Sequence, residues 1–174
     1  MSSRTVRDAR PADAAACAEI YAPYVRDTAI SFETEPPTAA TMAERIATAQ
    51  QRHAWLVLED AGQVLGYAYA APFKAREAYR WACEVSVYVT RGAARSGAGR
   101  ALYEALFDRL RERGYRTLAA GMTLPNEASV GLHRALGFVP VGVWQRIGWK
   151  QGSWHDVAWM QRPLGTLGDA PPGP

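Results

Sequence analysis

The sequence predicts a single α/β domain in which a mixed central sheet is flanked by helices. Residues 84–89 alternate between apolar and polar side chains, as a strand does when one face is buried. After a glycine-rich and arginine-rich segment, Leu102, Leu106 and Leu110 recur at every fourth position, which is typical of an amphipathic helix. The whole chain reads as strand, two helices, three strands, helix, strand, helix and two strands, and this order predicts a mixed α/β layer.

The residues before the central strand predict a short strand, two helices and a hairpin. The strand is expected at residues 5–6, and Pro11 suits the first turn of a helix. Residues 41–44 fit a capping box inside a second helical region that ends near Gln51. Two further strands meet at the turn formed by residues 60–62. Their predicted ranges are 54–59 and 63–71.

Beyond the central helix, which Gly114 ends as a left-handed cap, the pattern predicts a strand, a helix and two longer strands. Their ranges are 117–123, 125–138, 139–149 and 154–161. One domain is expected over residues 1–164. The tail, residues 165–174, is rich in glycine and proline and is expected to be disordered.

Composition limits the class of function. The 174 residues suffice for one sizeable core, and the net charge of +3 comes with arginines that are spread along the chain. Nucleic-acid binding is therefore not indicated, whereas a local site for an anion is. The first ten residues do not resemble a signal peptide and no apolar run could span a membrane, so a cytoplasmic protein is expected.

Three residues with reactive side chains have no predicted catalytic role. Cys17 and Cys83 are far apart and form no C-x-x-C motif, so neither a disulfide nor a metal site is expected. His53 lies in a polar connection and is expected to be a surface residue.

The segment after the central strand predicts an anion-binding loop. Gly97 and Gly99 would let backbone N–H groups approach a phosphate, and the N-terminus of the next helix favours negative charge. Arg95 and Arg100 flank these glycines. A plain tight turn is the alternative. The segment has neither the Lys-Ser/Thr ending of a Walker loop nor the later acidic residue of a dinucleotide site.

Val89, followed eight and ten residues later by Gly97 and Gly99, resembles the acyl-CoA pyrophosphate loop of the GNAT superfamily of N-acetyltransferases. Ala94 stands where that superfamily usually has Gln or Arg, which removes one side chain and leaves the backbone cradle unaffected. Several strings are similar, more narrowly, to the phosphinothricin and methionine sulfoximine/sulfone acetyltransferases. They are Lys74-Ala75-Arg76 with Tyr79 and Trp81, Glu84-Val85-Ser86-Val87-Tyr88-Val89, Leu124-Pro125-Asn126 with Ser129, Leu132-His133-Arg134-Ala135-Leu136-Gly137-Phe138, and Gly152-Ser153-Trp154-His155-Asp156-Val157.

The resemblance implies the GNAT acyl-CoA N-acyltransferase fold, acetyl-CoA as co-substrate, and Glu84 as the general base that deprotonates the acceptor amine. A strand-edge salt bridge is the alternative role for Glu84. His133 matches the position from which a tyrosine protonates the leaving thiolate in many relatives, although a buried structural histidine would also suit it. Residues implied to contact acetyl-CoA are Val87, Tyr88, Val89, Arg95, Ser96, Gly97, Ala98, Gly99, Arg100, Asn126 and Ser129. Capping alone would also explain Asn126 and Ser129.

An α-amino acid acceptor presents a carboxylate beside its amine. Lys74 and Arg76 would suit that carboxylate, or a phosphinyl or sulfonyl group, although solvated loop charges are the plainer interpretation. Phe32, Tyr79 and Ser86 are expected to line the acceptor pocket, with anchoring of its loop as the alternative role for Phe32.

The predicted function is acetyl-CoA-dependent N-acetylation, by direct transfer, of a small amino acid such as phosphinothricin, methionine sulfoximine or methionine sulfone. A polyamine, an aminoglycoside or a protein N-terminus is the alternative acceptor, and the cationic loop argues against the first two. A non-catalytic acyl-CoA sensor would be expected to lack the base, but Glu84 is present. The resemblance also implies a homodimer, with an aromatic-rich end as interface material. Its residues are Trp144, Trp149, Trp154 and Trp159, and His155 and Asp156 are expected to be structural or interface residues.

Overall fold

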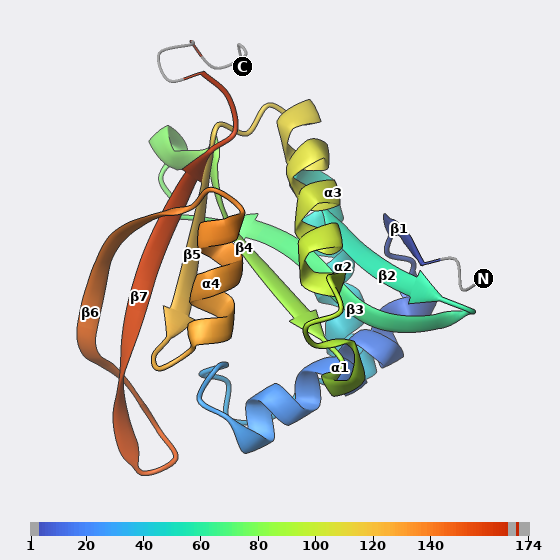
Figure 1. Ribbon diagram of the computed structural model, residues 1–174. Coiled ribbons are helices and arrows are strands. Elements are labelled where there is room, and N and C mark those ends of the chain that lie inside the picture. Colours follow the sequence, from blue (N-terminus) through green and yellow to red (C-terminus); the bar gives the residue numbers. More distant parts are fainter. Residues whose placement is uncertain (1–3, 167–169, 171–174) are drawn as a thin grey trace.

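A computed structural model describes residues 4–166 and residue 170, and its core is one seven-stranded sheet (Figure 1). The strand order is β1-β2-β3-β4-β5-β7-β6, with β4 and β5 parallel and every other neighbouring pair antiparallel. The strands are β1 Thr5–Asp8, β2 Trp55–Asp60, β3 Gln63–Pro72, β4 Ala82–Val89, β5 Thr117–Thr123, β6 Val139–Lys150 and β7 Ser153–Pro163. The predicted mixed sheet is confirmed.

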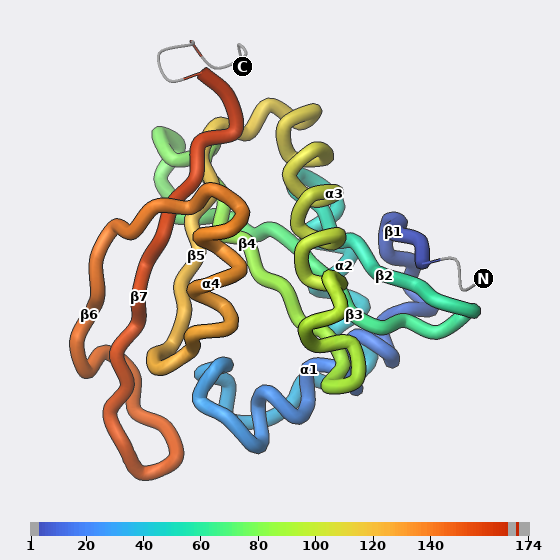
Figure 2. Tube along the Cα trace, in the orientation of Figure 1, coloured from blue at the N-terminus to red at the C-terminus, as the bar shows by residue number. Residues whose placement is uncertain are grey.

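Helices lie on both faces of this sheet. They are α1 Ala14–Asp27, α2 Ala39–Arg52, α3 Ala98–Glu112 and α4 Glu127–Ala135. The apolar sides of α1 and α2 pack on β2, β3 and β4, whereas α3 and α4 pack on the opposite face (Figures 1 and 2). On the face that carries α1 and α2, strands β5, β7 and β6 extend beyond these helices and form one side of the cleft described below.

The predicted alternation in β4 separates the two cores. Val85 is buried in the core beneath α3, and Val87 and Val89 pack against the same core. Tyr88 points to the opposite face, where its ring meets that of Tyr21 edge-on at a centroid distance of 4.8 Å. Glu84 has the same strand parity as Tyr88, so the strand directs its carboxylate to the face that carries α1 and α2.

Two predicted local features are wrong. Helix α2 is capped by Thr38, whose Oγ1 accepts a hydrogen bond from the Thr41 N–H at 3.1 Å, so residues 41–44 lie within the helix and do not cap it. His53 is buried instead of exposed, because it stacks on Tyr115 at a centroid distance of 5.1 Å. Burial lowers the pKa of His53.

Most strand and helix boundaries differ from the predicted ones by one or two residues. The end of α4 differs by three, while the predicted range 117–123 matches β5 throughout. Cys17 and Cys83 are buried free thiols. Over the described ranges, no helix combines the length and apolar character needed to cross a membrane. Of the tail predicted to be disordered, residues 167–169 and 171–174 lie outside the described residues.

Candidate active site

The two parallel strands at the centre of the sheet separate along their length. Strands β4 and β5 form three residue pairs, the last between Glu84 and Ala119. Both strands continue, to Val89 and Thr123, without another pair between them in the described structure, and a V-shaped gap opens (Figure 1). A narrow cavity of about 50 Å³ in this gap is lined by β4, β5 and α4. The separated strands therefore offer unpaired backbone groups to an extended ligand.

The wide end of the gap leads to the glycine-rich loop. A short turn at Arg91–Ala93 follows β4, and Arg95 and Gly97 then adopt positive φ angles of 61° and 83°. Gly97 is the N-cap of α3, and no side chain caps this helix. Backbone N–H groups of the first turn are thus left for another partner, and the helix dipole favours an anion there.

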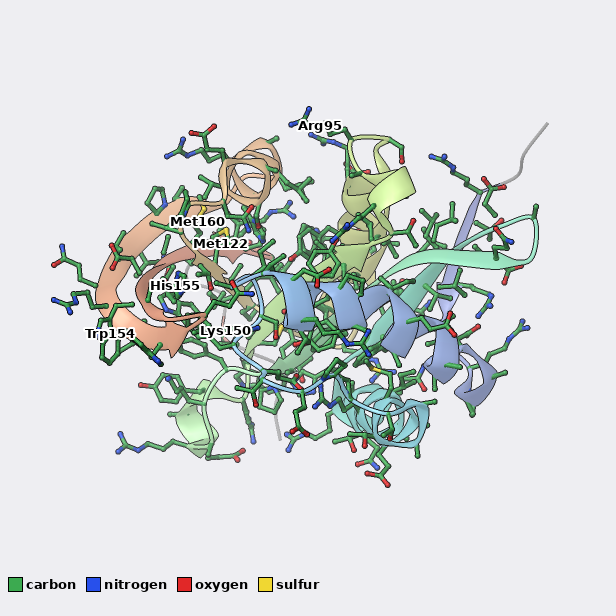
Figure 3. All side chains as sticks on the ribbon, turned by 90° about the horizontal axis from the view of Figure 1, so that it is seen from below. Arg95, Met122, Lys150, Trp154, His155 and Met160 are labelled. Carbon is green, nitrogen blue, oxygen red and sulfur yellow. The ribbon has the colours of Figure 1, made fainter. Side chains whose placement is uncertain are left out.

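The side chains of this loop divide between structural contacts and solvent. Ser96 Oγ donates a hydrogen bond to the Ala93 carbonyl at 2.8 Å, and Ala98 is buried. Arg95 projects away from the body of the protein (Figure 3), and Arg100 forms an exposed ion pair with Glu104 at 3.2 Å. Both side chains lie at the surface, where they could turn toward a bound anion.

Gly99 has a packing role that the sequence does not reveal. A Cβ added to Gly99 would lie 3.2 Å from Leu132 Cδ2, tighter than an ordinary contact, so glycine allows α3 to approach α4 closely. A Cβ on Gly97 would meet nothing within 4 Å, and there glycine is favoured by the positive φ alone.

Glu84 lies where the closed end of the gap meets an open cleft of about 520 Å³. The cleft is walled by the segment between α1 and α2, by β3, β4 and β5, and by the β6–β7 hairpin. Burial raises the pKa of the Glu84 carboxyl above its usual range, and the positive charge of Lys74 partly opposes this shift. A carboxylate in such surroundings is a better proton acceptor near neutral pH than an exposed one.

His133 is buried beside the gap, and both ring nitrogens have partners. Nδ1 donates a hydrogen bond to the Ser129 carbonyl at 2.7 Å, which leaves Nε2 to accept from the Tyr103 hydroxyl at 3.1 Å. Burial lowers the pKa of His133, so the imidazole is neutral at neutral pH. Asn126 Oδ1 accepts from the Ser129 N–H at 3.2 Å and caps α4, and both residues also line the gap.

The predicted acceptor residues are distributed over the cleft and its neighbourhood. Phe32 and Ser86 line the same cleft as Glu84. Lys74 lines an adjoining pocket of about 350 Å³ that shares Trp144 and Trp159 with the cleft.

Arg76 and Tyr79 are not among the residues that line either cavity in the described structure. Arg76 is exposed, immediately before a short turn at Glu77–Tyr79, and the Tyr79 ring packs edge-on against Phe73 at 5.7 Å. The structure thus brings Glu84, Ser86 and Phe32 together with Lys74 beside them, and leaves Arg76 and Tyr79 on the neighbouring loop.

Several cleft residues are absent from the predicted acceptor pocket. They include Glu33, Tyr69, Gly121 and Thr123, together with Trp144 and Trp159, which the sequence analysis assigns to the interface. Gly121 fits closely under the indole of Trp159, since an added Cβ would lie 3.1 Å from that ring. The period of two in β5 places Gly121 and Thr123 on one face, but only the three-dimensional fold shows that this face meets the cleft.

Residues 6–159 match the acetyltransferase (GNAT) domain family. The chain therefore belongs to the GNAT family and is an N-acetyltransferase by class. It is 40% identical to phosphinothricin N-acetyltransferase of Streptomyces viridochromogenes, over 97% of this chain and 91% of that protein. It is 39% identical to the L-methionine sulfoximine/L-methionine sulfone acetyltransferase of Pseudomonas paraeruginosa, over 97% and 99% of the two chains. The crystal structure of a phosphinothricin acetyltransferase from Sinorhizobium meliloti in complex with acetyl-CoA superposes with a TM-score of 0.93, at 39% identity, over 97% of this chain and 93% of that one.

Proposed function

We propose that this protein transfers the acetyl group of acetyl-CoA to the α-amine of a small amino acid or analogue, such as phosphinothricin, methionine sulfoximine or methionine sulfone. The observation that carries the proposal is the position of Glu84, where the gap between β4 and β5 meets the acceptor cleft. A thioester in the gap and an amine in the cleft would meet at this carboxylate. The names of the relatives support the choice of acceptor.

The gap and the loop fit the two ends of acetyl-CoA, which supplies the acetyl group as an activated thioester. The uncapped N-terminus of α3, with the positive φ of Gly97, suits the pyrophosphate. At Val87, Tyr88 and Val89, β4 pairs with β3 but not with β5, and this edge of β4 suits the extended pantetheine arm. Residues of α4 also line the gap. Asn126 and Ser129 would contact this arm while capping α4.

The proposed mechanism is direct transfer with Glu84 as the base. An α-amine has a pKa of about 8 and arrives mostly protonated at neutral pH. Glu84 takes one proton from it, directly or through a water, and the freed lone pair attacks the thioester carbonyl. The C–N bond forms as the C–S bond breaks. The attacking nitrogen loses its second proton as the amide forms, and the departing thiolate takes up a proton, so CoA leaves as the thiol. Neutral His133 would relay this proton through Nε2, the ring nitrogen that faces the Tyr103 hydroxyl.

The acceptor's negative groups are proposed to lie on the Lys74 side of the cleft. Lys74 lines the pocket that adjoins the cleft, and its positive charge would attract a carboxylate attached to the same carbon as the reacting amine. Phe32 and Ser86 would then pack around the rest of the acceptor. Arg76 and Tyr79 are proposed to complete this side of the site from the neighbouring loop.

The function can be tested with purified protein, acetyl-CoA and single amines, with the N-acetyl product identified by mass spectrometry. We expect product with phosphinothricin, methionine sulfoximine or methionine sulfone, and little with a polyamine of similar length that has no carboxylate. Acetylation of the polyamine alone would overturn the proposed acceptor class. Absence of any product, with acetyl-CoA bound, would favour a non-catalytic sensor.

Gly97→Val should weaken acetyl-CoA binding without unfolding the protein. A side chain at this positive φ costs about 1–2 kcal/mol, so the loop should leave the conformation that binds the pyrophosphate. The same free energy, spent on restoring that conformation, corresponds to roughly tenfold in affinity. Isothermal titration calorimetry with acetyl-CoA measures the effect. Gly92→Val is the matched control, because Gly92 lies in the same loop with open space around it and no positive φ. Equal affinities for wild-type protein and a folded Gly97→Val variant would remove the pyrophosphate assignment.

A homodimer is proposed on the exposed edge of the sheet. Strand β6 is an edge strand, and its apolar side chains stand in solvent together with Trp154 of β7. The exposed residues are Val139, Val141, Val143, Trp144, Ile147, Trp149 and Trp154. A long apolar edge is an aggregation hazard unless another chain covers it, and a second copy would do so.

Light scattering after size-exclusion chromatography should therefore report a dimer for wild-type protein. Trp149→Glu should shift the species toward a monomer, because a carboxylate in a desolvated apolar interface is unfavourable. Glu112→Gln on the exposed end of α3 should leave the mass unchanged. A wild-type monomer at micromolar concentration would contradict the proposal.

A further inference from the structure

Lys150, the last residue of β6, is buried although both of its neighbours in the chain are exposed. Its residue exposure is 8%, against 60% for Trp149. Its ammonium donates two hydrogen bonds of 2.6 Å, one to the carbonyl of Val25 and one to the carbonyl of Ser31. In Figure 3, Lys150 lies between the β6–β7 hairpin and the end of α1. One side chain thus ties the hairpin to a segment more than a hundred residues earlier in the sequence.

The two carbonyls belong to the end of α1 and to the wall of the acceptor cleft. Val25 lies in the last turn of α1, where carbonyl groups lack a partner within the helix. Ser31 belongs to what we call the acceptor loop, residues 28–33, which contains no helix or strand and lines the cleft with Phe32 and Glu33. The position of this loop therefore depends on side-chain contacts.

The acceptor loop also has contacts with α1 and α2. The Tyr21 hydroxyl lies 2.6 Å from Ser31 Oγ, and Arg45 binds Glu33 through two hydrogen bonds of 2.7 and 2.9 Å. These contacts hold the loop from the side of the helices. Lys150 holds it from the β6–β7 hairpin, so this wall of the cleft is fixed by the helices and by the hairpin.

A second contact from the same hairpin supports this arrangement. Gly148 packs against the ring of Phe32 so closely that an added Cβ would collide with it. Lys150 is itself held, because His155 Nε2 donates a hydrogen bond to its carbonyl at 2.9 Å. The hairpin thus reaches the acceptor loop at two points, one polar and one apolar.

We propose that Lys150, with Gly148, is a positioning element that fixes the acceptor loop in the conformation that binds the acceptor. The inference rests on the proposed function for the identity of the acceptor, but not for the clamp itself. Without the ammonium, two buried carbonyls lose their donor and the loop populates other conformations. The apparent dissociation constant of the acceptor then rises in inverse proportion to the fraction of protein with the loop in place.

Lys150→Met tests the clamp, because methionine fills similar space without a donor. Hydrogen exchange of the backbone amides of residues 28–33 should become about tenfold faster or more, as expected for local opening, while β4 amides keep their protection. The KM for methionine sulfone should rise by about tenfold or more. The kcat at saturating acceptor and the dissociation constant of acetyl-CoA should change little.

Gln151→Ala is the matched control. Gln151 is the next residue, and its exposed side chain makes one long hydrogen bond, 3.3 Å, to the Arg26 carbonyl. Its removal should leave both loop exchange and acceptor KM at wild-type values. Gly148→Ala is a second test that keeps Lys150, and it should show the same accelerated loop exchange because it displaces Phe32.

Unchanged exchange of residues 28–33 in Lys150→Met would overturn the proposal, and if that variant does not fold, unchanged exchange in Gly148→Ala would do so. Faster exchange spread equally over β4 and the loop would also overturn it, because it would indicate general destabilisation. Faster loop exchange with an unaltered acceptor KM would remove the role in acceptor binding. If no amino acid is acetylated at all, the exchange results still decide on the clamp, and the proposed function alone fails.

Discussion

Replacing Glu84 with glutamine should lower kcat by about 10²–10⁴-fold, the usual contribution of a general base. The amide is nearly the same size, so acetyl-CoA affinity should change little. Because burial raises the pKa of Glu84, wild-type activity should fall as the pH drops through a value above the usual range of a carboxyl group. Glu84→Gln should lose this acidic limb, and its deficit should shrink at high pH as free amine becomes abundant.

The measurement is kcat against pH for wild type, Glu84→Gln and Glu77→Gln. Glu77 is an exposed glutamate whose carboxylate pairs with Arg80, so its replacement controls for the loss of one negative charge near the cleft. A Glu84→Gln variant within about threefold of wild type at neutral pH, far below the contribution expected of a base, would mean that Glu84 is structural.

Replacing Lys74 with methionine should have two separable effects. Loss of one charge-assisted hydrogen bond, worth about 1.5–3 kcal/mol, should lower kcat/KM for methionine sulfone by about 10- to 150-fold. The lysine charge also lowers the pKa of Glu84. Without it, burial acts unopposed, the pKa of Glu84 rises further, and the acidic limb of the pH profile moves to higher pH.

Arg76→Ala is the natural comparison for Lys74→Met, since both residues are exposed on the same loop, but only Lys74 lines the pocket that adjoins the cleft. We expect a smaller loss of kcat/KM and no displacement of the acidic limb. For an acceptor amine without a carboxylate, kcat/KM should change little with either substitution. Equal losses for acceptors with and without a carboxylate would indicate a collapsed loop, and no loss with Lys74→Met would return this lysine to the role of a solvated charge.

Much of the fold follows from local sequence patterns. The alternation of β4 places Val85 in one core and Tyr88 in the other, as its period of two requires. The turn between β2 and β3 also follows from its residues, since Ala61 and Gly62 both have positive φ, the conformation of a tight hairpin turn. His53 was placed wrongly because its burial depends on Tyr115, sixty-two residues further on.

The candidate site was predictable only in part, because several of its contacts also depend on residues that are distant in the sequence. Glu84 could be placed from its strand and from family resemblance, whereas the partners of His133 could not all be inferred. Ser129 is one helical turn away, but Tyr103 lies on a different helix. The sequence predicts only that Gly99 lets the backbone approach a phosphate. Its contact with Leu132 depends on how α3 and α4 pack. Long-range packing determines these features, and a single sequence carries no direct signal for it.

In the proposed mechanism, the acetyl donor and the acceptor amine meet at Glu84. A crystal structure of the dead-end complex with CoA and methionine sulfone tests this meeting point most directly. We predict the CoA arm between β4 and β5, and the acceptor nitrogen about 2.6–3.2 Å from a Glu84 carboxylate oxygen or joined to it by one water. An acceptor amine bound outside the cleft, with no water path to Glu84, would contradict this.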